Sequence, residues 1–198
     1  MNPDLEIQRL RELLPASGRM RTVIRPARQT RRMIDAPFPK PWQWGDRTIS
    51  INFNQWAQLP EPERDLLVLR TVSWLVGIQW FKPDLYQSLA AAATGGILFE
   101  LIQQDAVGIL VSGGLGAIAL RQIWQQYRSP EREVDADTAA IQIAQRRGYD
   151  LDTAAGSLLS AIKTVAQLEG RSSLSYVELL RCQNLKAQRN LQSATTSR

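Results

Sequence analysis

The 198-residue chain contains no histidine and only one cysteine. Zinc sites depend mainly on histidine and cysteine ligands, and histidine is the side chain that most readily exchanges a proton near neutral pH. We therefore expect no metal, no cofactor and no enzymatic activity, and a protein that acts by binding. Cys182 alone cannot form an internal disulfide, which favours a reducing intracellular compartment.

Signals for export and for phosphate or acyl chemistry are also missing. No charged segment followed by a short apolar stretch opens the chain, so no signal peptide is predicted. Gly113-Gly114-Leu115-Gly116 has no preceding strand and no lysine, unlike a phosphate-binding loop. Ser73, Ser112 and Cys182 have no histidine to activate them as nucleophiles. The composition, 44% apolar and 22% charged, is that of a globular protein with one hydrophobic core.

Positive charge is concentrated near the N-terminus, although the whole chain carries a formal net charge of only +5. Six residues define an N-terminal arginine patch: Arg19, Arg21, Arg25, Arg28, Arg31 and Arg32. Arginine at this density is suited to nucleic-acid phosphates, anionic lipid headgroups or an acidic partner protein. A solvated strand edge or loop is the structural alternative.

Hydrophobic spacing, prolines and glycines predict an α+β fold that is mostly helical, with a small β-sheet. The alternating stretch from Arg47 to Phe53 is the most strand-like part of the chain. The predicted helices are, in order, one from Asn2 or Asp4 to Pro15, one over 61–80, one from Pro130 to Gly148, one from Asp152 to about Leu168, and one that begins after Ser173 or Ser175.

These elements suggest three parts. Residues 1–46 would form the N-terminal helix and an arm that is basic and then rich in proline and tryptophan. Residues 47–192 would form a helical domain, and 193–198 a disordered tail.

The segment from Asp84 to Leu120 is the most apolar part of the chain, and the polar residues from Glu100 to Asp105 divide it. Neither half reaches the ~20 apolar residues that span a bilayer, so we expect an apolar helical hairpin. The hairpin lies either in the protein core or in or on a membrane. Together with the tryptophan arm it offers contact residues for a membrane or another protein: Trp42, Trp44, Leu98, Phe99, Ile109 and Leu110.

A carboxylate pair follows this hairpin. The segment EREVDADTAAIQIAQRRGYD, residues 131–150, places Glu133 and Asp137 one helical turn apart on one face. It resembles the second motif of the membrane-associated zinc metallopeptidases of the HtpX and CAAX-prenyl-protease class. In those enzymes the glutamate is the third zinc ligand and the aspartate supports the histidine ligands. The order of elements is also similar, with the strand 47–53 followed by a helix on which the His-Glu-x-x-His motif would fall from Arg70 to Trp74.

The resemblance implies a metallopeptidase-like helical domain without its metal, because Arg70, Thr71 and Trp74 stand where the class has its two histidines and its catalytic glutamate. None of these side chains can hold zinc or activate water. A carboxylate buried without a metal needs another positive partner. We therefore hypothesise that Arg70 pairs with Glu133 in place of zinc, and that Trp74 fills the remaining space. Alternatively, Glu133 and Asp137 are acids at a helix start, and Arg70 is a surface residue.

The leading functional prediction is a non-catalytic protein that assembles, stabilises or regulates other proteins at or near a membrane. One alternative is a nucleic-acid-binding module that uses the N-terminal arginine patch, and another is an enzyme of unfamiliar type that uses Glu133, Asp137 and Arg70. The stretches MNPDLEIQRLRELLPASGRM and RTVSWLVGIQWFKPDLYQ also resemble a family of uncharacterised cyanobacterial proteins. That resemblance implies a photosynthetic bacterium with thylakoid or plasma membranes nearby. We expect an intracellular, cytoplasmic protein, or one associated with such a membrane at the surface or through the hairpin.

Overall fold

The structure is a computed structural model that describes residues 1–27, 31–39, 45–78, 88, 91–95, 111, 114–118, 121–122 and 129–196. The chain forms two compact units, one made of residues 1–78 with 130–198 and the other of residues 79–129. Both boundaries predicted from the sequence, after 46 and after 192, fall inside the first unit.

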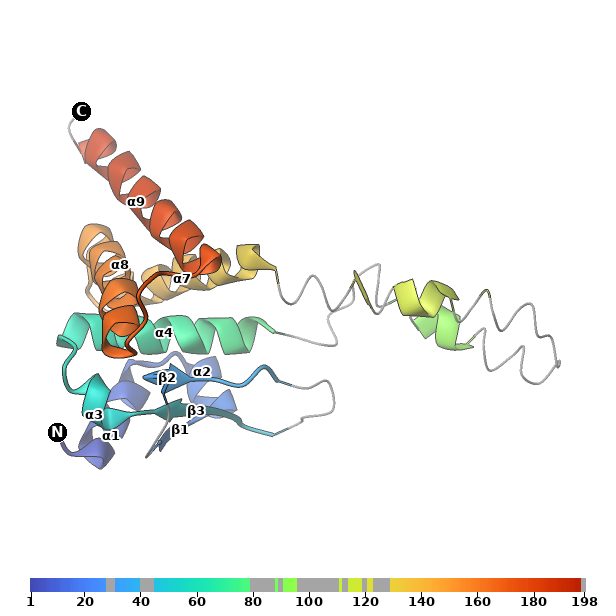
Figure 1. The fold of residues 1–198 in the computed structure, drawn as a ribbon, viewed down its shortest axis with the longest axis horizontal. Coiled ribbons are helices and arrows are strands. Elements are labelled where there is room, and N and C mark those ends of the chain that lie inside the picture. The colour runs from blue at the N-terminus through green and yellow to red at the C-terminus, as the bar shows by residue number, and fades with distance from the viewer. Residues whose placement is uncertain are drawn as a thin grey trace. The chain divides into compact units, whose positions relative to one another are not determined.

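All the labelled elements belong to the first unit, and they confirm the prediction of a mostly helical α+β fold (Figure 1). In chain order they are α1 (Pro3–Leu13), α2 (Ala16–Arg21), β1 (Thr22–Pro26), β2 (Ile34–Asp35), β3 (Arg47–Ile51), α3 (Phe53–Trp56), α4 (Glu61–Gly77), α7 (Pro130–Gln145), α8 (Leu151–Leu168) and α9 (Tyr176–Thr196).

The three strands form a small mixed sheet in the order β1-β3-β2. β1 runs parallel to β3, with Thr22 opposite Arg47, and β2 runs antiparallel to β3. The strand predicted over 47–53 is present but ends at Ile51. The side chain of Asn52 accepts a hydrogen bond from the backbone N–H of Asn54 at 3.2 Å, so this residue caps α3 and turns Phe53 into a helical residue.

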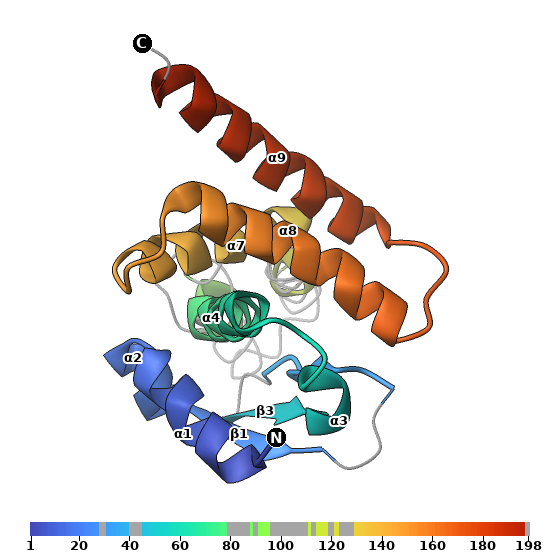
Figure 2. The same cartoon turned by 90° about the vertical axis from the view of Figure 1, so that its left-hand side faces the viewer.

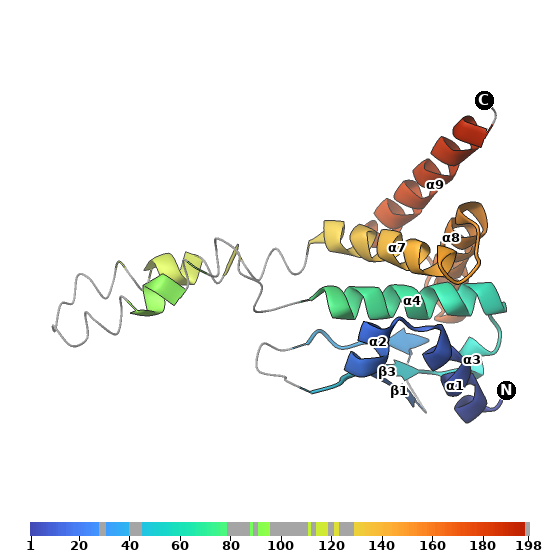
Figure 3. The ribbon, with the colours of Figure 1, turned by 180° about the vertical axis from the view of Figure 1, so that it is seen from behind.

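Helix α4 lies at the centre of the unit. Glu61 and Glu63 in its first turn, with proline near its start, favour a helix beginning here, and the helix predicted over 61–80 is present over 61–77. Four consecutive residues, Leu66 to Leu69, are buried, so the helix is covered on most faces. Figure 2 shows α4 nearly end-on, with the sheet, α1 and α2 on one side and α7 and α8 on the other. Figure 3 shows the same layers from behind.

The remaining helices begin and end at recognisable signals. Gly148 and Gly170, predicted to end two of them, have positive φ angles of 97° and 70°. Helix α8 is capped by Asp150 and not by the predicted Asp152, because Asp150 accepts hydrogen bonds from the N–H and the hydroxyl of Thr153. Helix α9 is helical through Thr196, so residues 193–196 of the predicted tail continue the helix.

Most of the predicted apolar hairpin lies outside the described residues, as do Arg28, Trp42, Trp44, Leu98, Phe99, Ile109 and Leu110. Within it, residues 91–95 and 114–118 are helical. Among the helical residues that the structure describes, none belongs to a helix long and apolar enough to cross a membrane.

Candidate functional site

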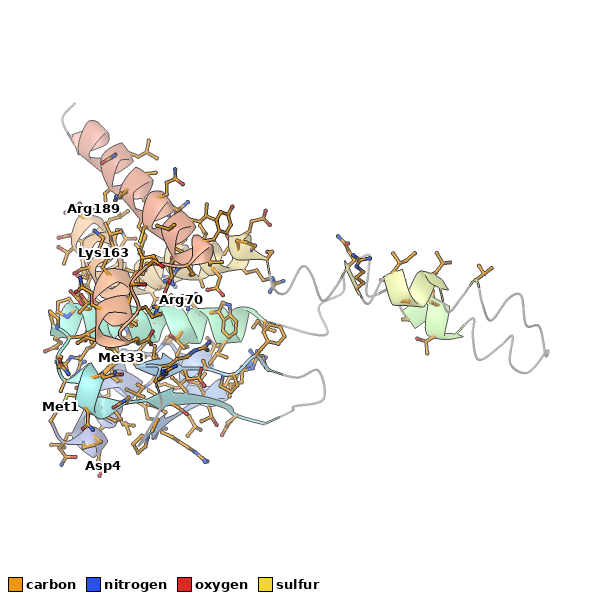
Figure 4. The ribbon with its side chains drawn as sticks, viewed as in Figure 1. Met1, Asp4, Met33, Arg70, Lys163 and Arg189 are labelled. Carbon is orange, nitrogen blue, oxygen red and sulfur yellow. The ribbon has the colours of Figure 1, made fainter. Side chains whose placement is uncertain are left out.

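Arg70 lies on α4 at the level where α7 and the start of α9 approach it (Figure 4). Its guanidinium forms an ion pair with Glu133 of α7, as predicted, and its Nε lies 3.4 Å from Oδ1 of Asp137. Only 16% of the Arg70 side chain is exposed, against 26% for Glu133 and 1% for Asp137. The predicted contact between Arg70 and Glu133 is therefore present. That this ion pair replaces a zinc site stays a prediction.

Asp137 has a second arginine partner that the sequence did not reveal. Arg181 of α9 donates two parallel hydrogen bonds to it, from Nε to Oδ2 at 2.7 Å and from Nη2 to Oδ1 at 2.8 Å. Both side chains are almost fully buried, with 9% and 1% exposed. A two-pronged contact of this kind is among the stronger polar contacts in proteins. We call Arg70, Glu133, Asp137 and Arg181 the central charge cluster, since it joins α4, α7 and α9.

The cluster holds two guanidinium groups close to one carboxylate. Burial and the nearby charge of Arg181 lower the pKa of Arg70, and Asp137 opposes that shift. Arginine ordinarily keeps its proton to pH values above 12, so Arg70 stays charged at neutral pH in spite of this shift. The oxygens of Asp137 accept two hydrogen bonds from Arg181 and face Arg70, so its carboxylate is held by arginine on two sides.

The two other residues of the predicted degenerate motif lie apart from this pairing. Thr71 is buried and its hydroxyl donates to the backbone carbonyl of Leu67 at 2.8 Å, an ordinary contact within a helix. Trp74 is half-buried, and its ring meets Phe38 edge-on with centroids 5.9 Å apart. Trp74 thus packs against the segment between β2 and β3, and it does not line the cavity beside Arg70.

The N-terminal arginine patch is spread over several elements. Arg19 and Arg21 lie on α2, Arg25 lies on β1, and all three are exposed. Arg31 and Arg32 precede β2 and line a cavity that also reaches Arg70. The patch therefore divides into an outer group and a pair beside the central charge cluster.

A second charge network lies at the other end of α4. Glu6 of α1 accepts hydrogen bonds from Arg9 at 2.9 Å and from Arg64 at 2.8 Å. Asp65, 4% exposed at its side chain, accepts from the hydroxyl of Tyr149 at 2.8 Å and pairs with Arg9. Burial of the phenol and the hydrogen bond to Asp65 raise the pKa of Tyr149. This network fixes α1 and the turn before α8 against α4.

The sequence analysis did not identify Arg171 or Arg181 as site residues, although one signal was present for Arg181. Arg181 follows Val177 by four residues and precedes Leu185 by four, so it lies at helical spacing between two apolar residues. A charged residue at such a position must be paired when the helix packs. Arg171 had no comparable signal, because it lies in the loop before α9.

In the part of the chain that the structure describes, no three potential metal ligands of the His, Cys, Asp or Glu type lie together. The carboxylates of the central charge cluster are bound by arginine. The site can therefore fix three helices to one another and present positive charge to the adjoining cavity.

The fold and the site define a mostly helical α+β protein with a buried arginine–carboxylate cluster. Residues 8–149 match a family described as "Protein of unknown function (DUF3318)", and the chain belongs to that family. The chain is also 27% identical over 167 residues to the thylakoid membrane protein slr1949 of Synechocystis sp., a match that covers 82% of this chain and 77% of that protein. The resemblance to cyanobacterial proteins is thus confirmed, and no solved structure matches the chain.

Proposed function

We propose that this protein is a non-catalytic, metallopeptidase-like factor that associates with a membrane and binds other proteins there. The observation that carries the non-catalytic part is the pairing of Asp137, a carboxylate of the central charge cluster, with two arginines. Asp137, the most buried carboxylate of the candidate site, is held by both Arg181 and Arg70. Ion pairs and hydrogen bonds occupy the oxygens of Asp137, which supports a structural role for this carboxylate.

Membrane association is supported by the relative's name and by an apolar face in the second unit. Val111 is helical, and Leu115 and Ile118 lie three residues apart on one side of the helical stretch 114–118. They are 58%, 46% and 65% exposed. Exposed apolar residues on one helix face favour contact with lipid or with another protein.

Cell fractionation tests this proposal. The full-length protein, expressed in a cyanobacterial host, should sediment with membranes, and a Leu115→Gln/Ile118→Gln variant should move to the soluble fraction. Leu5→Gln/Leu191→Gln is the matched control, because Leu5 and Leu191 are leucines of the first unit that are at least as exposed, at 66% and 71%. Chemical crosslinking in the membrane fraction would then identify the proteins bound. Retention of the first variant at the wild-type level, or salt-sensitive binding to DNA or RNA in place of membranes, would contradict the proposal.

The metallopeptidase ancestry is a separate part of the proposal, supported by the order β3, α4, α7 and by the contact of Arg70 with Glu133. A variant with Arg70→His and Trp74→His would restore the two histidine positions. If the scaffold is shared, this variant should bind Zn²⁺ in a calorimetric titration, and adding Glu133→Gln should weaken that binding. Equal zinc affinity with and without Glu133→Gln, or no zinc binding by a folded Arg70→His/Trp74→His variant, would contradict the ancestry.

A further inference from the structure

A cavity of about 900 Å³ lies beside the central charge cluster within the first unit. It is bounded by α4, α8, the loop and first turns of α9, and the residues just before β2. Pockets that hold organic ligands occupy ~300–1,000 Å³. The cavity is therefore large enough for a ligand, and the residues that line it indicate which kind of ligand.

Arginine dominates the charged lining. Five arginines line the cavity, with two glutamates and no aspartate or lysine: Arg31, Arg32, Arg70, Arg171 and Arg181, with Glu169 and Glu178. The arginines come from three separate parts of the sequence, so the fold gathers them at one place. A concave wall of like charge concentrates the opposite charge.

The two glutamates are already occupied. Glu178 accepts from Arg171 at 2.7 and 2.8 Å and from the N–H and hydroxyl of Ser175 at 2.8 and 2.9 Å. Glu169 accepts from the N–H of Met33 at 2.9 Å and from Nε of Arg171 at 3.0 Å. Their oxygens are held by these internal partners, so they offer a ligand little hydrogen-bonding capacity.

Several arginine donors remain unused. Arg31 has no hydrogen-bond or ion-pair partner among the described residues. Arg181 donates from Nε and Nη2, and its Nη1 has no partner in the same part of the chain. The buried Nε of Arg70 faces Asp137 at 3.4 Å and makes no hydrogen bond with described residues. Each arginine carries five N–H donors, so the cavity holds a surplus of positively charged donors.

One wall of the cavity is apolar. Ile34 from β2, Leu67 from α4, and Ile162 and Val165 from α8 line it. A ligand that fills the cavity therefore has an uncharged, partly apolar body next to its negative group. Donors on separate elements suit a tetrahedral anion with oxygens in several directions better than a planar carboxylate, which a single guanidinium can hold.

We propose that this cavity binds a phosphate ester, with the phosphate among Arg31, Arg70 and Arg181 and the rest of the molecule against the apolar wall. The same chemistry is offered by a soluble phosphate ester and by the headgroup of an anionic phospholipid. The proposal does not rest on membrane association, because soluble probes test it directly. It gives Arg31 a role distinct from that of the outer arginines of the patch.

Calorimetric titration of the full-length protein tests the proposal at fixed ionic strength. The probes are inorganic phosphate, glycerol 3-phosphate and short-chain dihexanoyl phosphatidylglycerol below its micelle concentration. The short-chain lipid should bind more tightly than inorganic phosphate, since only it reaches the apolar wall. Arg31→Gln should weaken binding by about tenfold or more, the usual effect of losing a charged hydrogen bond. Arg25→Gln, an exposed arginine of the same patch outside the cavity, is the matched control and should bind as the wild type does.

A vesicle assay separates the two sources of phosphate. Arg31-dependent retention on vesicles of phosphatidylglycerol in phosphatidylcholine, absent with pure phosphatidylcholine, assigns a lipid headgroup. Arg31-dependent binding of glycerol 3-phosphate without such retention assigns a soluble ester. Absence of saturable binding to every probe, or equal affinities for Arg31→Gln and Arg25→Gln, would overturn the proposal. Neither result would affect the fractionation test of Leu115 and Ile118.

Discussion

The carboxylate of Asp137 lies between the guanidinium groups of Arg70 and Arg181, and 1% of its surface is exposed. Removing one partner from a buried ion pair usually costs ~3–5 kcal/mol, because the remaining charge is left unpaired. Arg181→Gln should therefore lower the free energy of unfolding by about 3 kcal/mol, with Arg70 compensating part of the loss. Urea denaturation measures the change.

Arg189→Gln is the control for that experiment. Arg189 lies on the same helix and also donates two hydrogen bonds to an aspartate, Asp152, but this pair is exposed. Exposed pairs contribute ~0–1 kcal/mol. Similar losses for Arg181→Gln and Arg189→Gln would mean that the buried pair is not a major structural contact.

Gly18 marks a close approach between α2 and α4. A Cβ atom added at this position would lie 2.6 Å from a side-chain methyl carbon of Val72. Gly18→Ala should lower the free energy of unfolding by about 1–3 kcal/mol, the usual cost of overpacking. Gly77→Ala, where an added Cβ meets nothing within 4 Å, should be neutral or slightly stabilising. Thermal unfolding of both variants checks the contrast, and a stable Gly18→Ala protein would exclude tight packing of α2.

At the scale of elements, the start of α9 depends on a reciprocal cap. Glu178 accepts from the N–H of Ser175, and the hydroxyl of Ser175 accepts from the N–H of Glu178 at 3.3 Å. Burial would raise the pKa of Glu178, but the hydrogen bonds from Arg171 and Ser175 outweigh it and bring the pKa down to about 2. The ionised form is therefore favoured in the folded protein.

The lowered pKa of Glu178 makes the free energy of unfolding depend on pH. Because the folded pKa of Glu178 lies below the unfolded value of 4.5, its contribution to stability is complete above pH 4.5 and is lost as the pH falls towards about 2. Wild type should lose more stability over this interval than Glu178→Gln, whose side chain cannot titrate. Denaturation curves recorded between these pH values check this, and parallel losses would contradict the capping role.

Some of these elements could be predicted from the sequence, and others could not. The helix 61–77 was predictable because acids, a proline and an apolar stretch all agree locally. Strand β2 was not, because a two-residue strand carries no periodicity and exists only through its pairing with β3. Asp150 and Asp152 are equally good caps by residue type; in the structure Asp150 caps the helix and Asp152 pairs with Arg189 of α9.

For the site, the Arg70–Glu133 contact could be predicted from a positional comparison with a known motif. The contact between Arg181 and Asp137 could not. Arg181 and Asp137 are 44 residues apart, and α9 reaches α7 only when both helices pack on the same core. Charge pairing over such a separation depends on tertiary structure, which residue spacing does not determine. The cavity proposed to bind a phosphate ester could not be predicted from the sequence either, because its arginines belong to separate segments.

At the scale of the whole molecule, two charge networks fix the helices around α4. The network of Glu6, Arg9, Arg64 and Asp65 lies at its start and the central charge cluster lies further along it. Both join elements that are far apart in the chain. We propose that the charged residues of the candidate site stabilise this arrangement of helices.

A double-mutant cycle on Arg70→Gln and Glu133→Gln, read by the free energy of unfolding in urea, tests that claim most directly. Residues in direct ionic contact show coupling energies of ~0.5–3 kcal/mol, and we predict a favourable coupling of at least about 1 kcal/mol between these two. Additive effects within about 0.5 kcal/mol, with both single variants as stable as the wild type, would contradict a structural role for the pair.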